Sequence, residues 1–340
     1  MQSSNIPSLA RSFLGASLLS VATAFGAAMA QAPYPDKAIT WVVPYNPGGA
    51  TDAIARLLAQ KLGEEVGQSV VIQNVPGAGT VIGATQVARA APDGYRIMSA
   101  DIATLAISPA LTPNVGYDPV TSFTAVGEIA RLPLVLVVHK DVPASTVTEL
   151  IDYAGQPGVD LNYASAGPGS PHHMGMELLL HRTGANMTHI PYNGAGPAMA
   201  DVLSGRVGVM FGSLGAVLPH IQAGVLKPLG VSGLQPLAGL DGVPPLAKDD
   251  PRLADYEMYA WQGVVGPAGM PAAVTQSLNA ALEKILASGE VQERLGALGV
   301  QAAFSSPQAF QEYIESEVRL WNDVVQERGL KNGSPAQNAR

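Results

Sequence analysis

Short apolar runs alternate with longer stretches of mixed polarity along most of the chain. The runs are rich in Val, Ile and Leu, as in residues 39–44 and 134–139. Continuously apolar runs of this kind are typical of parallel strands that are buried on both faces. The alternation with helical spacing predicts an α/β fold with mostly parallel sheets. The expected strands are 39–44, 69–73, 95–99, 134–139, 160–163, 188–192, 207–211, 226–231 and 261–265.

The stretches between these strands carry helix-start residues and apolar positions near helical spacing. Two segments, 108–122 and 236–253, are rich in Pro, Gly and Asp and are expected to be loops. The last ten residues, 331–340, form a polar tail. The expected helices are about 51–62, 80–90, 143–154, 171–182, 197–203, 216–223, 271–287, 290–298 and 307–327.

One arrangement recurs, in which a strand runs into a glycine turn and then a helix start. In its first occurrence, Gly48 and Gly49 lie between the strand at 39–44 and a helix with Thr51 and Asp52 in its first turn. Glycine allows a sharp bend and close approach of a ligand. The first N–H groups of a helix lack intrahelical partners and lie at the positive end of the helix dipole, so such a turn favours anions. An ordinary βα turn with no ligand is the alternative for any one of these turns.

Similar turns occur at 73–80, 163–171, 191–197 and 211–216, and none of them contains Lys or Arg. The carboxyl ends of parallel strands meet at one edge of a sheet, where ligands bind. A crevice lined by backbone N–H groups and short hydroxyls suits a small carboxylate. For Asp52 a role in holding the turn is favoured over ligand contact, because an acid in the first helical turn complements the dipole.

Composition limits the alternatives. The 340 residues suggest about two domains, and 47% are hydrophobic while 14% are charged. The net charge is −8 and no basic run is present, so nucleic acid is not an expected partner. An anion must therefore be held by local donors, not by the overall field. The absence of cysteine excludes disulfides, a cysteine nucleophile and a thiolate zinc site.

The N-terminus has the parts of a cleaved secretory signal peptide. Arg11 precedes an apolar stretch over residues 12–22, and Ala28-Met29-Ala30 offers a small-x-small cleavage site. We expect cleavage after Ala30, so that the mature chain starts at Gln31 and is exported in soluble form. A membrane anchor is disfavoured because the apolar region is short and rich in Ala, Ser and Gly.

The sequence does not match the motifs for nucleotide binding, metal binding or acyl transfer. Residues 77–83 resemble a dinucleotide-binding turn but contain one residue too many, and the chain has no P-loop and no G-x-S-x-G. His172 and His173 are adjacent, so a helix directs them about 100° apart and they cannot chelate one metal. Of the six histidines, His173 is the one expected in the crevice, and the other five are expected to be structural or to lie on the surface. Four of these, His139, His181, His189 and His220, have no matching carboxylates. No cofactor, metal or catalytic residue is predicted.

Several ordered motifs resemble the Bug family, the periplasmic solute receptors of tripartite tricarboxylate transporters. They are residues 44–52 with Ala55-Arg56, 74–79, 92–95, 163–170 with His173, and 191–194 with Pro197-Ala198. Their order and spacing cover nearly the whole mature chain, which makes the resemblance specific although each motif alone is weak.

The resemblance implies a two-lobed periplasmic-binding fold of type II, a Venus flytrap. Lobe 1 would comprise residues 33–131 and 259–330, and lobe 2 residues 132–258. A small carboxylate or dicarboxylate would bind between the lobes, with one carboxylate held by the first two loops through backbone N–H groups and ordered water. The chain would be a periplasmic monomer that delivers its ligand to the membrane subunits of a transporter. A receptor for a membrane sensor kinase and, less favoured, an exported hydrolase stay open as alternatives.

Turns and resemblance together predict the ligand contacts, and two of these positions depart from the family. Asn193 stands where the family usually has Lys or Arg, and Gly212 where it usually has Asp. We hypothesise that the two changes reshape the ligand-specific half of the cleft. The expected contacts are Tyr45, Pro47, Gly48, Gly49, Thr51, Ala78, Gly79, Thr80, Ser99, Ser165, Gly167, Gly169, Ser170, His173, Asn193, Gly212 and Ser213.

Overall fold

The computed structural model describes residues 34–331. The expected signal peptide, its cleavage site and the polar tail beyond Lys331 lie outside the described residues. The fold below is that of one compact unit, which begins at Pro35. Within residues 34–331, no helix combines the length and the apolar character needed to cross a membrane.

The first sheet has six strands in the order β11-β4-β10-β3-β1-β2. β1 pairs in parallel with β2 and β3, whereas β10 and β11 are antiparallel to their neighbours. The expectation of mostly parallel strands thus holds for one half of this sheet and is wrong for the other. The bounds are β1 Ile39–Val43, β2 Val70–Asn74, β3 Arg96–Asp101, β4 Phe123–Arg131, β10 Gln262–Pro267 and β11 Gln301–Ala302.

β4 was not expected from the sequence. Its residues, FTAVGEIAR, include Thr, Gly, Glu and Arg, which interrupt the apolar run that marks the other strands. The segment before it is also more regular than a loop, because it contains a π-helical turn, η1 (Ala103–Ile107), and the short helix α3 (Ser108–Leu111).

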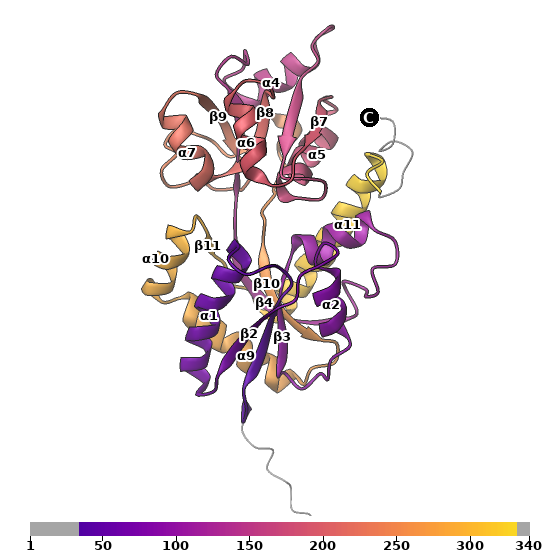
Figure 1. Cartoon of the computed structure of the whole chain (residues 1–340), viewed down its shortest axis with the longest axis vertical. Coiled ribbons are helices and arrows are strands. Elements are labelled where there is room, and N and C mark those ends of the chain that lie inside the picture. The colour runs from indigo at the N-terminus through magenta and orange to yellow at the C-terminus, as the bar shows by residue number, and fades with distance from the viewer. Residues whose placement is uncertain (1–33, 332–340) are drawn as a thin grey trace, which may run out of the picture. The chain divides into compact units, whose positions relative to one another are not determined.

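Helices cover both faces of this sheet. The strand order places β2 and β3 on opposite sides of β1, and right-handed crossovers then put α1 and α2 on opposite faces, as Figure 1 shows. The helices are α1 Ala50–Val66, α2 Val81–Ala88, α9 Ala272–Leu286, α10 Gly289–Ala297 and α11 Pro307–Glu327.

The second sheet has five strands in the order β7-β6-β8-β5-β9. β6 is parallel to β7 and β8, and β5 is antiparallel to β8 and β9. The strands are β5 Leu134–His139, β6 Asn162–Ser165, β7 Thr188–Pro191, β8 Val209–Ser213 and β9 Leu226–Val231. The helices are α4 Val147–Ala154, α5 Pro171–Thr183, α6 Ala195–Leu203, α7 Leu214–Gln222, α8 Leu246–Asp249 and the 3₁₀ turn η2 Pro251–Leu253.

Two chain segments connect the sheets and pair with each other. The N–H of Ala260 donates to the carbonyl of Leu132 at 3.0 Å. At the entry to the second sheet, the Ser232 hydroxyl donates to the Met258 carbonyl at 2.6 Å and accepts from the Leu134 N–H at 2.8 Å. Each sheet with its helices forms one lobe, called lobe 1 and lobe 2 here, so the fold is the expected two-lobed α/β fold. We propose that the lobe boundaries at 131/132 and 258/259 fall in these paired crossings.

Helix α11 fixes the start of β10. Ser306 caps the helix by accepting from the Ala309 N–H at 3.2 Å. Phe310 is fully buried, and its ring meets Trp261 edge-on with ring centroids 5.7 Å apart. The buried Glu317 accepts from the indole N–H of Trp261 at 2.8 Å. Trp261 therefore has a fixed orientation at the point where the second crossing enters lobe 1.

Candidate functional site

Asp52 holds the first glycine turn together. Its carboxylate accepts from the Gly48 N–H at 2.9 Å, from Arg56 Nε at 2.9 Å and from Asn74 Nδ2 at 2.9 Å. The Asn74 amide also donates to the Tyr45 carbonyl at 3.1 Å, so the first and second loops are joined. The Arg56 hydrogen bond, with those from Asn74 and Gly48, lowers the pKa of Asp52 to about 2.

The second loop is a run of left-handed residues. Gly77, Ala78, Gly79 and Thr80 have φ angles of 130°, 48°, 61° and 81°. Left-handed conformations are costly for non-glycine residues and occur often at ligand sites. Ser108 steadies the loop by donating to the Gly79 carbonyl at 2.8 Å. Thr80 precedes α2, and its buried hydroxyl oxygen has no hydrogen-bond partner in the described part of the chain.

The third loop leads into α5 of lobe 2. Pro171 occupies the first helical turn, and the Ser170 hydroxyl caps the helix by accepting from the His173 N–H at 3.3 Å. The same hydroxyl donates to the Gly167 carbonyl at 2.7 Å. The Gly169 N–H donates to His173 Nδ1 at 3.2 Å, so this loop is tied to its own helix.

These turns line two adjoining cavities that share Tyr45, Ala103 and Pro171. We call them the Trp261 cavity, of about 470 Å³, and the Gly79 cavity, of about 560 Å³, and together the cleft. Volumes of this size suit small-molecule ligands. The Trp261 cavity is further lined by Asn46, Pro47, Gly49, Ala50, Thr51, Asp101, Ile102, Leu132, Ala260, Trp261 and Gln262. The Gly79 cavity is further lined by Ala78, Gly79, Thr80, Ile107, Ser108, Leu111, Thr112, Pro168, Gly169 and Ser170.

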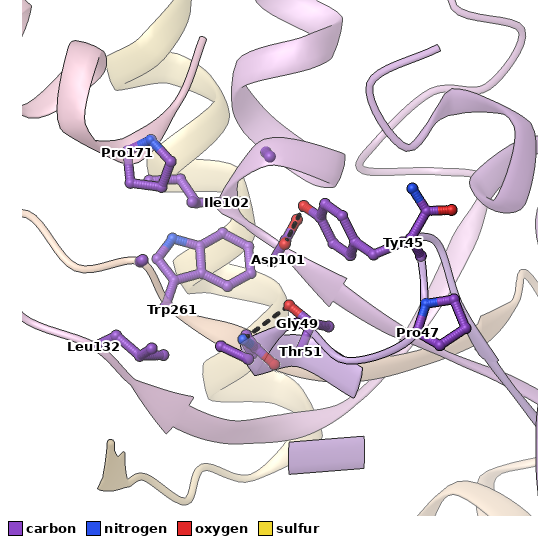
Figure 2. A pocket seen from close by; sticks show the side chains of 14 residues that line it. Tyr45, Pro47, Gly49, Thr51, Asp101, Ile102, Leu132, Pro171 and Trp261 are labelled. Carbon is purple, nitrogen blue, oxygen red and sulfur yellow. Dashed lines mark hydrogen bonds between the residues drawn. The ribbon is translucent and has the colours of Figure 1, made fainter. Parts of the chain in front are cut away.

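Figure 2 shows the Tyr45 hydroxyl directed at Asp101 in the Trp261 cavity. It donates to Asp101 Oδ2 at 2.5 Å, and Oδ1 accepts from the N–H and the hydroxyl of Thr104, each at 2.8 Å. Burial raises the pKa of Asp101, and burial together with the Asp101 charge raises the pKa of Tyr45. The Asp101 carboxylate is thus the acceptor in all three of these hydrogen bonds.

Gln262 lies beside this pair and is 4% exposed. Its Nε2 donates to the Thr51 hydroxyl at 3.1 Å, while its Oε1 has no partner among the described residues. Among residues 34–331, no Lys, Arg or His side chain lines either cavity. Any anion in the cleft would therefore be bound by backbone N–H groups, hydroxyls and helix starts.

The cleft contains many of the predicted contacts. Thr80 and Ser170, from different lobes, line the same cavity. Gly48 is placed differently from the expectation, because its N–H already binds Asp52 and it lines neither cavity. The expected contacts that line the cleft are Tyr45, Pro47, Gly49, Thr51, Ala78, Gly79, Thr80, Gly169 and Ser170.

Ser99 and Ser165, both expected to contact the ligand, line neither half of the cleft in this structure. Ser99 is 1% exposed, and its hydroxyl accepts from the Trp41 indole N–H at 2.8 Å. Ser165 is fully buried and lies 2.7 Å from His189 Nε2. Both side chains fix strands instead of facing the cleft.

His173 also lies outside the cleft. It is 4% exposed, its ring stacks on His189 with centroids 4.1 Å apart, and it lines a separate cavity with Glu177 and Arg328. Burial lowers the pKa of His173. Its role in the structure is to support the third loop through Gly169.

The two positions that depart from the family pattern do not reach the cleft either. Gly212 and Ser213 line a third cavity, of about 280 Å³, together with His172. Asn193 is exposed and, like Gly167, lines neither half of the cleft. A Cβ at Gly212 would overlap Cγ1 of Val217. The absence of a side chain at this position is therefore explained by local packing.

The residues of the cleft that sequence reasoning missed include Asp101, Trp261 and Gln262. Asp101 is the last residue of β3. The glycine turns were selected because ligands bind at the carboxyl ends of parallel strands, and the same reason applies to Asp101. Trp261 and Gln262 lie at the beginning of a strand, where that reason does not apply. The expectation about histidines also needs correction, because His181 lies 3.2 Å from Glu327 and His139 lies 3.4 Å from Asp141. Among the described residues, no group of three metal-ligating side chains is found.

Comparison with known sequences places the chain in a family. The family described as "Tripartite tricarboxylate transporter family receptor" matches residues 54–330. Protein BugT of Bordetella pertussis is 34% identical over 300 residues, which cover 88% of this chain and 91% of BugT. A protein encoded in the tcbD-tcbE intergenic region of Pseudomonas sp. strain P51 is 36% identical over 334 residues, covering 97% of this chain and 99% of the relative.

Comparison with solved structures supports the same family. The periplasmic binding protein BugD is 32% identical with a TM-score of 0.69, covering 88% of this chain and 99% of BugD. Rpa4515 of R. palustris, solved with adipate, is 35% identical with a TM-score of 0.71, covering 87% and 98%. MatC of Rhodopseudomonas palustris, with bound malate, is 30% identical with a TM-score of 0.69, covering 86% and 100%. The chain therefore belongs to the tripartite tricarboxylate transporter receptors, the Bug family of periplasmic solute-binding proteins.

Proposed function

We propose that this protein is exported to the periplasm, captures a small carboxylate in the cleft and delivers it to the membrane subunits of a tripartite tricarboxylate transporter. The observation that carries this proposal is the meeting of three helix starts, those of α1, α2 and α5, around a cleft to which the described part of the chain contributes no cationic side chain. The relatives solved with adipate and with malate support a carboxylate as the ligand class.

Helix starts can replace an arginine in such a site. Each contributes about 0.3–1 kcal/mol to anion binding at the surface and up to about 2 kcal/mol when partly buried. Direct N–H and hydroxyl hydrogen bonds add to this, and Thr51, Thr80 and Ser170 supply hydroxyls at the three helix starts. The donors come from both lobes, so a bound carboxylate would favour closure of one lobe over the other.

A binding role fits the cleft better than hydrolysis. A serine nucleophile must lie within hydrogen-bond reach of a base and be open to substrate. Ser165 and His189 meet the first condition, with 2.7 Å between Oγ and Nε2, but Ser165 is fully buried. We therefore expect carboxylates incubated with the purified protein to be recovered unchanged. Turnover detected by NMR would favour the enzyme alternative.

Gly49 offers a clean test of the cleft. It lines the Trp261 cavity, has a φ of −80° that valine can adopt, and has open space around its Cβ position. Gly49→Val should fold and lose carboxylate binding, because its methyl groups would enter the cavity. Gly289→Val is the matched control, since Gly289 also has open space and lines neither cavity.

Binding is measured by calorimetry and by the rise in Tm across a panel of mono- and dicarboxylates, since a ligand that binds only the folded state stabilises it. Wild type and Gly289→Val should respond to the same compounds, and Gly49→Val to none of them. Equal responses from all three proteins would contradict binding in this cleft.

Delivery to a transporter needs a cellular measurement. In cells that express the chain with its transporter membrane subunits, uptake of the labelled carboxylate should require the wild-type protein and fail with Gly49→Val. Uptake that continues without the protein, while a transcriptional response to the ligand is lost, would favour the sensor-kinase alternative.

A further inference from the structure

The two halves of the cleft differ in charge. The Gly79 cavity receives the starts of α2 and α5 from the two lobes, and none of the described residues that line it is acidic. The Trp261 cavity contains Asp101, and the helix that starts there, α1, carries Asp52 in its first turn. The carboxylate of Asp52 offsets the positive end of α1. The Gly79 cavity is thus the half that favours an anion.

Two buried side chains of the Trp261 cavity, Asp101 and Gln262, present hydrogen-bond acceptors. Asp101 is 8% exposed and receives its three hydrogen bonds from Tyr45 and Thr104. Gln262 is 4% exposed, and its amide oxygen has no partner among the described residues. A carboxylate brought next to these acceptors would lose its water without gaining a cation. It would also lie next to a second carboxyl group, that of Asp101.

The remaining walls of the Trp261 cavity are apolar. In the view of Figure 2, Ile102, Trp261 and Leu132 are grouped along one side, across from Tyr45 and Pro47. Trp261 is held in place by Glu317 and Phe310, so this surface is preformed. Preformed apolar walls bind the hydrocarbon part of a ligand, because burying it there removes it from water.

We propose that the ligand is a monocarboxylate with an uncharged, apolar body. Its carboxylate would bind in the Gly79 cavity and its body would fill the Trp261 cavity, so that a second carboxylate at the far end is rejected. This inference rests on the proposed function, and it narrows the ligand from carboxylates in general to singly charged ones.

Matched ligand pairs test the inference. Hexanoate against adipate and benzoate against terephthalate differ by a single terminal carboxylate within each pair. Calorimetry on the wild-type protein should give a Kd for one or both monocarboxylates at least tenfold below that of the paired dicarboxylate. A dicarboxylate that binds as tightly as its partner, or more tightly, would overturn the inference and leave carboxylate capture intact. Failure of the wider carboxylate panel would instead refute the proposed function.

A cation placed in the Trp261 cavity should reverse the preference. Leu132 lines this cavity and is partly exposed, so Leu132→Lys can bring an ammonium group to the far end of the ligand. We expect the ratio of adipate to hexanoate affinity to rise at least tenfold. Leu132→Met, of similar length and uncharged, should leave the ratio near that of wild type.

A lysine at a second position keeps the inference testable if Leu132→Lys does not fold. Asn46 lines the same cavity and is exposed, so Asn46→Lys should be tolerated and should shift the ratio in the same direction. Circular dichroism establishes that each variant is folded before it is titrated. A folded lysine variant at either position with an unchanged ratio would show that charge in this cavity does not select the ligand.

Discussion

Replacing Asp52 by asparagine should destabilise the protein and loosen the first glycine turn. The carboxylate accepts hydrogen bonds from Gly48, Arg56 and Asn74, and it is 2% exposed. Asparagine has nearly the same shape but only one acceptor oxygen, and its NH₂ group would face at least one of these donors. A buried donor left without an acceptor costs about 1–3 kcal/mol.

The pKa of Asp52 gives an independent magnitude. It falls from its usual 3.8 to about 2, mainly through the Arg56 hydrogen bond. At about 1.4 kcal/mol per pH unit, this corresponds to roughly 2.5 kcal/mol of stability at neutral pH. Arg56 is 51% exposed, and solvent screens its share of the interaction. We therefore expect Asp52→Asn to lower the free energy of unfolding by about 1–2 kcal/mol at pH 7.

The effect should depend on pH in a defined direction. Because the folded-state pKa is lowered, the stabilisation is complete above the unfolded-state value of about 4 and is lost as pH falls towards 2. Urea unfolding of both proteins at several pH values from 7 to 3 should show the difference shrinking below about pH 4. Asp241→Asn, at an exposed loop position, controls for removal of a charge. A difference that stays constant over this range, or that Asp241→Asn reproduces, would refute the assignment.

Three further predictions follow from buried contacts. Gly212→Asp should lower the free energy of unfolding by about 1–3 kcal/mol, because its Cβ would overlap the side chain of Val217. Adding Val217→Ala should recover part of this loss, as measured by urea unfolding. An undiminished loss in the double variant would contradict the explanation. Glu177→Gln should lower the free energy of unfolding by about 2–4 kcal/mol, because Arg328, whose Nε donates to Glu177 at 2.7 Å, would lose its buried carboxylate partner. An unchanged Tm would show that the ion pair contributes nothing to stability. Burial lowers the pKa of His172 to about 4, so NMR should find its imidazole neutral at pH 5.5. The free energy of unfolding should fall as the pH drops from about 6.5 to 4, because the unfolded state takes up the proton first. Half-protonation of His172 near pH 6.5 would contradict this prediction.

The first two loops of the cleft could be predicted because their chemistry is local. Glycine spacing next to an apolar strand identifies the turn, and the first residues of the next helix identify Asp52 as its support. The partners of Asp52, Gly48 and Arg56, are each four residues away, within reach of one helical turn and its approach. Local sequence patterns contain this information, and both loops indeed adjoin one cleft at Tyr45.

Side-chain direction was harder to predict at the ends of strands. Ser165 ends β6, whereas Ser99 lies two residues before the end of β3, on the same face of that strand as the cleft residue Asp101. Ser99 meets Trp41 from the neighbouring strand, and Ser165 meets His189 from another. Whether such a side chain reaches the cleft or bonds to a neighbouring strand depends on tertiary packing, and a single sequence does not reveal it. The same reason explains His173, whose ring turns towards His189 and Glu177 and not towards the cleft.

Trp261 and Gln262, which the sequence did not reveal, lie in the cleft because β10 runs antiparallel to its neighbour β3. Ligand sites in parallel sheets gather at the carboxyl ends of strands. β10 runs antiparallel to β3, and Gln262 pairs with Asp101, so the amino end of β10 lies beside the carboxyl end of β3. A strand that returns from the other lobe must enter at this edge, because both crossings lie there. Trp261 and Gln262 therefore belong to the cleft by topology, and in a two-lobed fold the starts of such returning strands are candidate ligand contacts alongside the ends of the parallel ones.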